Sequence, residues 1–187
     1  MTGFKPYSNF KRNPSGEIAE LLDGSYFKGK EVVGITLEVK HSVIEKRYLM
    51  ELKKEYEIII NTGIGPGRNV IGIEKIAVNW QGSTKDEEGS SRDGKIAKDA
   101  PDGIFTRLPV EEILHSLRSA KIPSEISFSA GTFLCNKILY CSLYYSTARA
   151  GFIHFPLDSE SSLDGKYPSM IIDNMIKSVE LAIQKTI

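Results

Sequence analysis

Short apolar runs alternate with amphipathic stretches along this chain of 187 residues, and their order constrains the fold more than any other feature. Runs typical of strands, rich in apolar and β-branched residues, occupy residues 32–39, 56–63, 73–80, 125–128 and 151–156. Stretches with helical spacing of apolar residues occupy residues 15–22, 41–54, 109–118, 132–145 and 169–184. This alternation predicts an α/β fold: a single three-layer α/β/α domain over residues 1–187 with a largely parallel central sheet.

The segment 81–102 breaks this alternation. It is polar and includes the run Asp-Glu-Glu-Gly-Ser-Ser-Arg-Asp-Gly, which carries almost nothing to bury. We expect a surface loop within the domain.

The charge balance limits the classes of partner. Lys and Arg together number 24, as do Asp and Glu, and neither sign forms a block, so binding to nucleic acid or to a membrane surface is not expected. A small or peptidic partner fits better. No apolar stretch approaches the roughly 18 residues of a membrane span or resembles a signal peptide, which predicts a cytoplasmic protein.

The two cysteines occupy one predicted helix. Cys135 and Cys141 are six positions apart, which places their Cα atoms roughly 9 Å apart in a helix, too far for a disulfide. Cys135 follows a strand and a run of small residues, so it lies in the first helical turn, where the helix dipole favours thiolate. A buried core cysteine is the competing interpretation for Cys135 and the better one for Cys141.

Two further residues could act with this thiol. His154 interrupts an apolar strand, where a histidine is more often a satisfied core residue, but beside a thiol it would supply a base. Glu74 interrupts another apolar run, and a buried carboxylate is costly unless it is paired. An imidazole is one possible partner, and Lys75, Arg68 or solvent are the alternatives. His41 and His115 fall in charged helical stretches and are expected at the surface.

Other chemistries lack support in the sequence. Glycines at 63, 65 and 67 suggest a phosphate loop, but Arg68 stands where a dinucleotide fingerprint needs glycine, and no Lys-Ser/Thr pair follows. His, Cys, Asp and Glu do not cluster at metal-ligand spacing. We therefore expect neither a metal nor a cofactor.

Three segments together resemble the pyroglutamyl peptidase I family of cysteine peptidases. Residues 129–136, Ser-Ala-Gly-Thr-Phe-Leu-Cys-Asn, are similar to its nucleophile signature, residues 63–79 to its glutamate signature, and residues 151–156 to its histidine region. The resemblance implies a Glu74–Cys135–His154 triad that removes N-terminal pyroglutamyl residues from peptides without a metal or cofactor. It also implies a cytoplasmic homo-oligomer, often a tetramer.

The resemblance extends to the substrate pocket. Residues 2–15 are similar to the family's substrate loop, in which Phe4 and Tyr7 would hold the lactam ring and Asn13 would help to fix it, with Phe133 from the nucleophile signature as a further binding residue. Ordinary core packing is the alternative for the two aromatic rings of the loop.

The sequence also departs from the family's usual pattern. The apolar strand ahead of Thr2 is almost missing, which predicts reduced stability or subunit contacts that cover the gap. Tyr7 replaces a phenylalanine, Ser8-Asn9 replace two glycines, and Trp80 to Thr84 replace an Asp-rich stretch with an arginine. The last change leaves open a catalytically weak or inactive relative that binds a peptide N-terminus or another small ligand.

The expected mechanism follows from the triad. The Cys135 thiolate attacks the pyroglutamyl carbonyl, N–H groups of residues 131–135 stabilise the oxyanion, and His154 protonates the leaving amine. Glu74 orients the imidazole. A thiolate–imidazolium pair would hold the pKa of Cys135 below its usual value of about 8.5.

Overall fold

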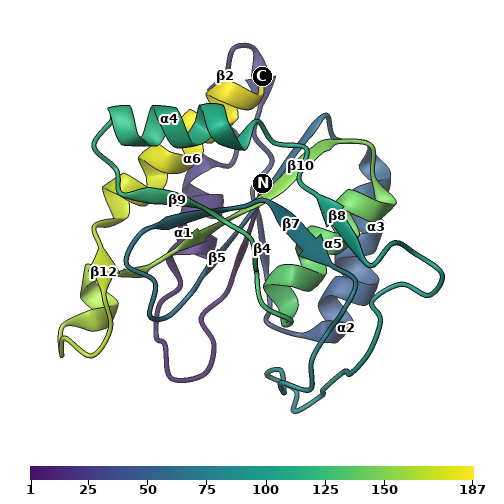
Figure 1. Cartoon of the computed structure of the whole chain (residues 1–187). Coiled ribbons are helices and arrows are strands. Elements are labelled where there is room, and N and C mark those ends of the chain that lie inside the picture. Colours follow the sequence, from purple (N-terminus) through teal and green to yellow (C-terminus); the bar gives the residue numbers. More distant parts are fainter.

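The computed structural model describes residues 1–187 and contains a central sheet of six strands (Figure 1). The strand order is β4 (Ile35–Leu37), β1 (Thr2–Phe4), β5 (Ile58–Ile64), β10 (Arg149–Phe155), β6 (Ile71–Glu74) and β9 (Ser124–Ser127). Every neighbouring pair is parallel except β10 and β6, which are antiparallel. The predicted α/β fold with a largely parallel sheet is confirmed.

Helices cover both faces of this sheet. One face carries α1 (Pro14–Leu22), α4 (Val110–Ser119) and α6 (Ile172–Thr186), which contact one another and the sheet. The other face carries α5 (Leu134–Tyr145) and a helical segment at 41–54. Each face buries a core cluster of 20 residues, with Phe152 on the α5 side and Ile153 on the α6 side, as alternation along β10 requires.

The helical segment at 41–54 is not uniform. It comprises α2 (His41–Val43), the π-helical turn η1 (Ile44–Tyr48), α3 (Leu49–Glu51) and the 3₁₀ turn η2 (Leu52–Lys54). The segment ends at Glu55, whose φ of 55° is left-handed. The predicted helix is present, but its sequence did not indicate the π turn.

Short paired strands lie outside the main sheet. They are β2 (Tyr26–Phe27) with β3 (Lys30–Glu31), β7 (Ile76–Val78) with β8 (Gly103–Phe105), and β11 (Leu157–Asp158) with β12 (Ser169–Met170), the last pair flanking η3 (Ser159–Ser162). The run predicted at 73–80 therefore divides into β6 and β7, because the backbone of Lys75 bonds to Ser127 and Thr106 instead. The strand predicted at 32–39 shrinks to β4.

The segment 81–102 contains no helix or strand beyond an isolated bridge between Gln81 and Gly94. It is nevertheless anchored. Asn79 accepts bonds from the N–H groups of Ile96 and Ala97 and donates to the carbonyls of Ala97 and Ala100. Ala97 and Ala100, which follow the polar run at 86–94, are buried in the α5-side core, so this end of the segment packs against the domain.

The first strand leaves an apolar slot beside it. β1 pairs with β5 at Thr2 and Asn61 only, and a cavity of about 260 Å³ lies where the edge of β5 continues. Its walls include Ile58 to Ile60 of β5, Leu52 from η2 and Ile183 from α6. The Met1 ammonium donates to the carbonyl of Val33 at this slot, and burial lowers its pKa to about 6.

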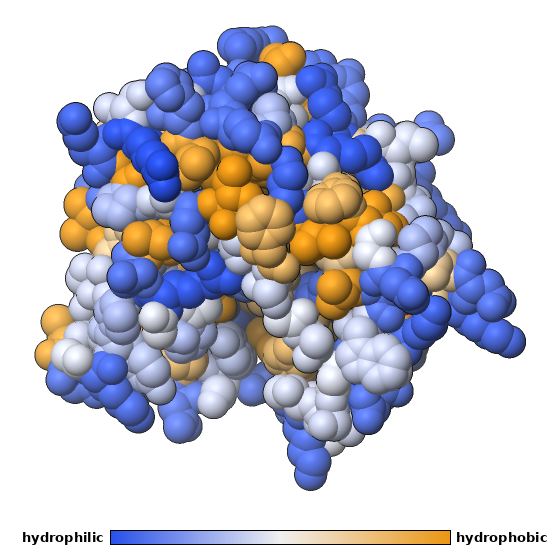
Figure 2. All heavy atoms as spheres, viewed as in Figure 1, coloured by the Kyte–Doolittle hydropathy of each residue, from blue (hydrophilic) through white to orange (hydrophobic).

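The surface is mixed. Figure 2 shows apolar side chains gathered in a band between α4 and the β7–β8 pair, with hydrophilic residues around it. Phe105 in β8 and Phe128 after β9 are among the large apolar residues that remain exposed. No helix is both long and apolar enough to cross a membrane.

Candidate active site

Cys135 is the second residue of α5 and so lies in the first turn of that helix. Phe133 occupies the N-cap position without a side-chain cap, and the first N–H to bond within the helix is that of Lys137. The preceding N–H groups of the first turn are therefore free to meet an oxyanion. The turn into the helix uses Gly131, whose φ of 75° lies in the left-handed region that glycine adopts readily.

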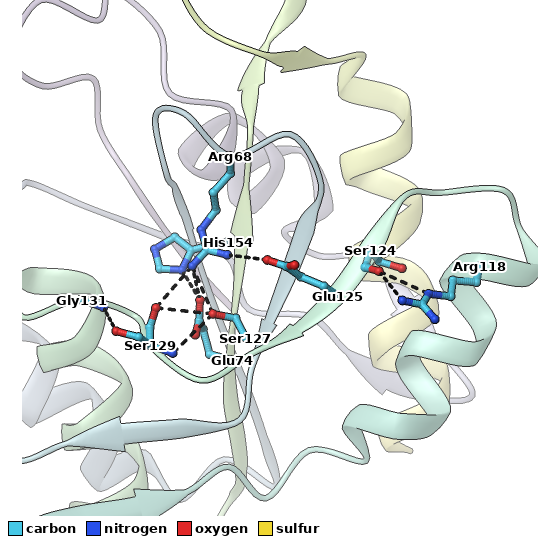
Figure 3. Close-up of polar contacts among 9 residues, drawn as sticks. All are labelled: Arg68, Glu74, Arg118, Ser124, Glu125, Ser127, Ser129, Gly131 and His154. Carbon is cyan, nitrogen blue, oxygen red and sulfur yellow. Dashed lines mark hydrogen bonds and ion pairs between the residues drawn. The ribbon is translucent and has the colours of Figure 1, made fainter.

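His154 and Glu74 come from the one antiparallel pair in the sheet. His154 lies opposite Gly72, two residues before Glu74, so both side chains project from the α5 side. Nδ1 of His154 lies 2.7 Å from Oε1 of Glu74, and both residues are buried (Figure 3). The glutamate also pairs with Arg68, at 2.9 Å, while Lys75 pairs with Glu111 instead.

Gly63 brings the thiol to the sheet. It pairs with His154 across β5 and β10, and a Cβ built on it would lie 3.1 Å from Sγ of Cys135 and 2.9 Å from Cζ of Phe152. The absence of a side chain thus lets Cys135 approach the strand next to His154. The thiol and the imidazole do not hydrogen bond to each other in this structure.

Burial dominates the protonation of both groups. It raises the pKa of Cys135 to about 12, the negative charge of Glu74 adds to this, and Arg68 opposes it. Burial also lowers the pKa of His154, against the raising effect of Glu74. Burial therefore favours a neutral thiol and a neutral imidazole in the resting site and opposes the expected thiolate–imidazolium pair, which stays a prediction.

A small apolar cavity opens beside the thiol. Its volume is about 30 Å³, which holds little more than a water molecule. A five-membered ring therefore fits only if a lining side chain moves, and Tyr7 is a partly exposed candidate. The lining brings the four residues predicted to bind substrate together with the nucleophile: Phe4, Tyr7, Asn13, Val39, Ile64, Phe133, Leu134 and Cys135.

Asn13 already uses most of its amide within the chain. Its Oδ1 accepts from the backbone N–H and the hydroxyl of Ser15, and its Nδ2 donates to the carbonyl of Lys5. Asn13 caps α1 and ties down the loop that carries Tyr7. It shapes the cavity through that loop, with one amide hydrogen left for a ligand.

Comparison with known proteins agrees with this geometry. The family model described as pyroglutamyl peptidase matches residues 1–187. The chain belongs to the pyroglutamyl peptidase family. A pyrrolidone-carboxylate peptidase from Lactobacillus helveticus is 36% identical over 194 residues, covering 98% of this chain and 96% of the relative. One from Thermococcus litoralis is 38% identical, covering 98% of this chain and 90% of the relative.

Solved structures of pyroglutamyl peptidases show the same fold. A mutant pyrrolidone carboxyl peptidase from Pyrococcus furiosus superposes with a TM-score of 0.91 at 37% identity, covering 99% of this chain and 95% of that one. The Thermococcus litoralis enzyme gives 0.89 at 38% identity, covering 99% and 90%. The chain is therefore a hydrolase of the cysteine peptidase class.

Two structural features of this family member were not visible in its sequence. Ser8, which replaces a glycine of the family pattern, has a left-handed φ of 54° and donates its N–H to Glu87. His41 is fully buried and lies edge-on to Phe133 with 5.8 Å between ring centroids. The prediction that His41 lies at the surface is wrong, because charged neighbours in its stretch face solvent while its own side chain points inward. His115 is exposed, as predicted.

Arg68, which the sequence offered as an alternative partner for Glu74, bonds to that carboxylate together with His154. Its further contacts with Ser127 and Ser129 were not indicated by the sequence.

Proposed function

We propose that this protein removes N-terminal pyroglutamyl residues from peptides through a thioacyl-enzyme intermediate. The observation that carries the proposal is the cavity formed by Phe4, Tyr7 and Phe133, which opens directly onto Cys135. Glu74 on β6 and His154 on β10 lie 2.7 Å apart, and His154 pairs with Gly63, the residue that the thiol approaches.

The protonation states suggest the order of proton transfers. In the resting site Nδ1–H of His154 donates to Glu74, so Nε2 carries the free lone pair and acts as the base. As Sγ of Cys135 attacks the carbonyl carbon, its proton passes to Nε2, and the carbonyl oxygen becomes an oxyanion near the first N–H groups of α5.

The same imidazole completes the cycle. The imidazolium, stabilised by Glu74, gives its proton to the leaving amine, and the C–N bond breaks. Water then attacks the thioester carbonyl as its proton passes to Nε2 of His154, the C–S bond breaks, and the imidazolium returns the proton to Sγ of Cys135 as pyroglutamate leaves. The buried carboxylate thus favours the charged histidine in the transition state, although the histidine is neutral at rest.

The composition of the cavity supports selectivity for pyroglutamate. The ring is flat and uncharged, and the lining offers apolar surface with one amide side chain. The lining contains no carboxylate for the α-ammonium group of a free N-terminus, so N-terminal glutamine would lose the solvation of its charge without compensation. Proline has the ring size but lacks the lactam carbonyl.

A chromogenic pyroglutamyl amide tests the proposal. Wild-type protein is expected to hydrolyse it faster than the prolyl and glutaminyl amides, and Cys135→Ser to lose at least about 10³-fold in kcat/KM. Cys141→Ser is the matched control, because that thiol is buried in the α5-side core.

Two outcomes would count against the proposal. Equal losses in the two serine variants would refute the nucleophile, and faster hydrolysis of the prolyl or glutaminyl amide would refute the pocket. Saturable binding of a pyroglutamyl peptide without hydrolysis would identify the inactive relative, which the change at Trp80 to Thr84 left open.

A further inference from the structure

The guanidinium of Arg68 joins three segments at the edge of the site. Nη2 donates to Oε1 of Glu74 at 2.9 Å, to the hydroxyl of Ser127 at 3.3 Å and to the carbonyl of Ser129 at 3.4 Å. Nη1 lies 3.6 Å from Glu125. Figure 3 shows these contacts converging beside His154. One side chain thus spans the β5–β6 turn, strand β6, and strand β9 with the loop after it.

The backbone around Arg68 accommodates this side chain. A Cβ on Gly65 would lie 2.8 Å from Cδ of Arg68, and one on Gly72 would lie 2.3 Å from its Nη1. Any larger residue at either position would displace the guanidinium or its stem. Gly65, one of the glycines that suggested a nucleotide loop, and Gly72 in β6 therefore leave room for the side chain of Arg68.

Arg68 and His154 share one acceptor. Both bond to Oε1 of Glu74, a residue with no exposed surface. Only Nη2 of Arg68 bonds to Glu74, but the same planar, permanently charged group also contacts Ser127, Ser129 and Glu125, and the point charge of a lysine would not reproduce this set of directions. The carbonyl of Ser129 belongs to the loop that leads through Gly131 into α5, so the same guanidinium also contacts the approach to Cys135.

We propose that Arg68 is a positioning residue of the reaction, which fixes the Glu74–His154 pair relative to the loop that presents Cys135. This inference rests on the proposed function. Arg68 does not line the substrate cavity, so it acts on turnover through Glu74 and the Ser127–Ser129 segment and not through substrate binding.

The charge of Arg68 gives this role a signature in pH. The charged or titratable groups near His154 are Glu74, Arg68 and the thiol of Cys135, with Glu125 beyond Arg68. A fixed positive charge opposes protonation of the imidazole. Its removal is expected to raise the pKa of His154 and so to move the acid limb of kcat/KM to higher pH.

Arg68→Met and Arg68→Lys, assayed with the pyroglutamyl amide, test the proposal. The methionine variant is expected to lose roughly 10- to 100-fold in kcat with KM within about threefold of wild type, and to show the shifted acid limb. The lysine variant is expected to keep the acid limb but to recover only part of kcat. Arg118→Met is the matched control, since Arg118 also bonds to a carbonyl of β9, that of Ser124, at a distance from the triad (Figure 3).

An unchanged kcat and an unmoved acid limb in Arg68→Met would overturn the proposal, as would an equal loss in Arg118→Met. If the methionine variant does not fold, an unchanged kcat in Arg68→Lys overturns it, and a reduced kcat with the wild-type acid limb supports it. If the wild-type protein does not hydrolyse the amide, the proposed function fails, and an NMR titration of His154 still tests whether Arg68 controls the imidazole.

Discussion

Gly63 shows how a single missing side chain can arrange a reactive pair. It lies beside His154 in the sheet. The Cβ of any other residue would lie 3.1 Å from Sγ of Cys135 and 2.9 Å from Cζ of Phe152, closer than van der Waals contact. Helix α5 can therefore bring its N-terminal turn onto the strand. Cys135 keeps part of its surface at the small cavity, and the packing around it raises the pKa of its thiol.

The protonation of this pair leads to a prediction about pH. Since the pKa of Cys135 is raised to about 12, alkylation of the free protein by iodoacetamide is expected to be slow at neutral pH and to rise steadily toward high pH. Since the pKa of His154 lies below its usual 6.5, the base stays neutral below pH 6.5. Hydrolysis of the amide should persist there and fall only as the pH drops through that lowered pKa.

Labelling rates of Cys135 and kcat/KM, both measured against pH, check this prediction, with Cys141→Ser removing the second thiol. A labelling rate that reaches a plateau below about pH 8 would indicate a resting thiolate and would restore the ion pair that the sequence suggested.

At the residue scale, the sequence predicted which residues are reactive better than it predicted their surroundings. The sequence indicated the first-turn position of Cys135. It also indicated His154 and Glu74, because a polar residue in an apolar strand stands out. It did not indicate the pKa of the thiol, because desolvation depends on which distant segments cover it. Arg68 could be suggested as a partner of Glu74, but its bonds to Ser127 and Ser129 could not, because those residues are about 60 positions away.

At the scale of elements, the long strands and helices were predictable, as were the short strands β4 and β9, but β2, β3, β8, β11 and β12 were not. Strands β5 and β10 and helices α4, α5 and α6 have enough apolar residues to display a period. Strand β8 has three residues and no period to display. The antiparallel direction of β6 is set by the turn at 65–68, and the apolar run alone did not indicate it.

The anchoring of segment 81–102 by Asn79 can be tested directly. Asn79→Ala removes four hydrogen bonds of a buried side chain, which is expected to lower the free energy of unfolding by roughly 2–3 kcal/mol. For a chain of this size that corresponds to a fall in Tm of roughly 5–10 °C. Trypsin should then cleave faster within the segment, at Lys85, Arg92, Lys95 or Lys98.

Thermal unfolding and timed trypsin digestion measure the two effects. Asn174→Ala in α6 is the control, since its half-buried side chain makes no hydrogen bond. Equal cleavage of both variants would show that the segment is held by its buried alanines and not by Asn79.

At the scale of the whole molecule, the slot beside β1 is the largest departure from close packing among the features described above. The backbone of β5 at Ile58 to Ile60 faces it on one side, and Leu52 and Ile183 line it. The direction of β1 carries any preceding residue into this slot, parallel to β5.

An extension of about five apolar residues fused ahead of Met1 is therefore expected to stabilise the protein. Burial of two or three side chains and pairing with β5 outweigh the ordering of the added residues by on the order of 2 kcal/mol. The expected rise in Tm is roughly 4–8 °C. An extension of equal length made of glycine and serine is the control, and equal Tm values for the two fusions would show that the slot does not accept a strand.

Strand β10 occupies the middle of the sheet, yet it is the last of the six strands to leave the ribosome. Its neighbours β5 and β6 are complete by residue 74, and β10 begins at residue 149. A nascent chain of intermediate length therefore exposes the facing edges of two strands for several seconds at ordinary rates of synthesis. His154 arrives on the strand that closes this gap, so an unfinished chain has no imidazole beside its thiol.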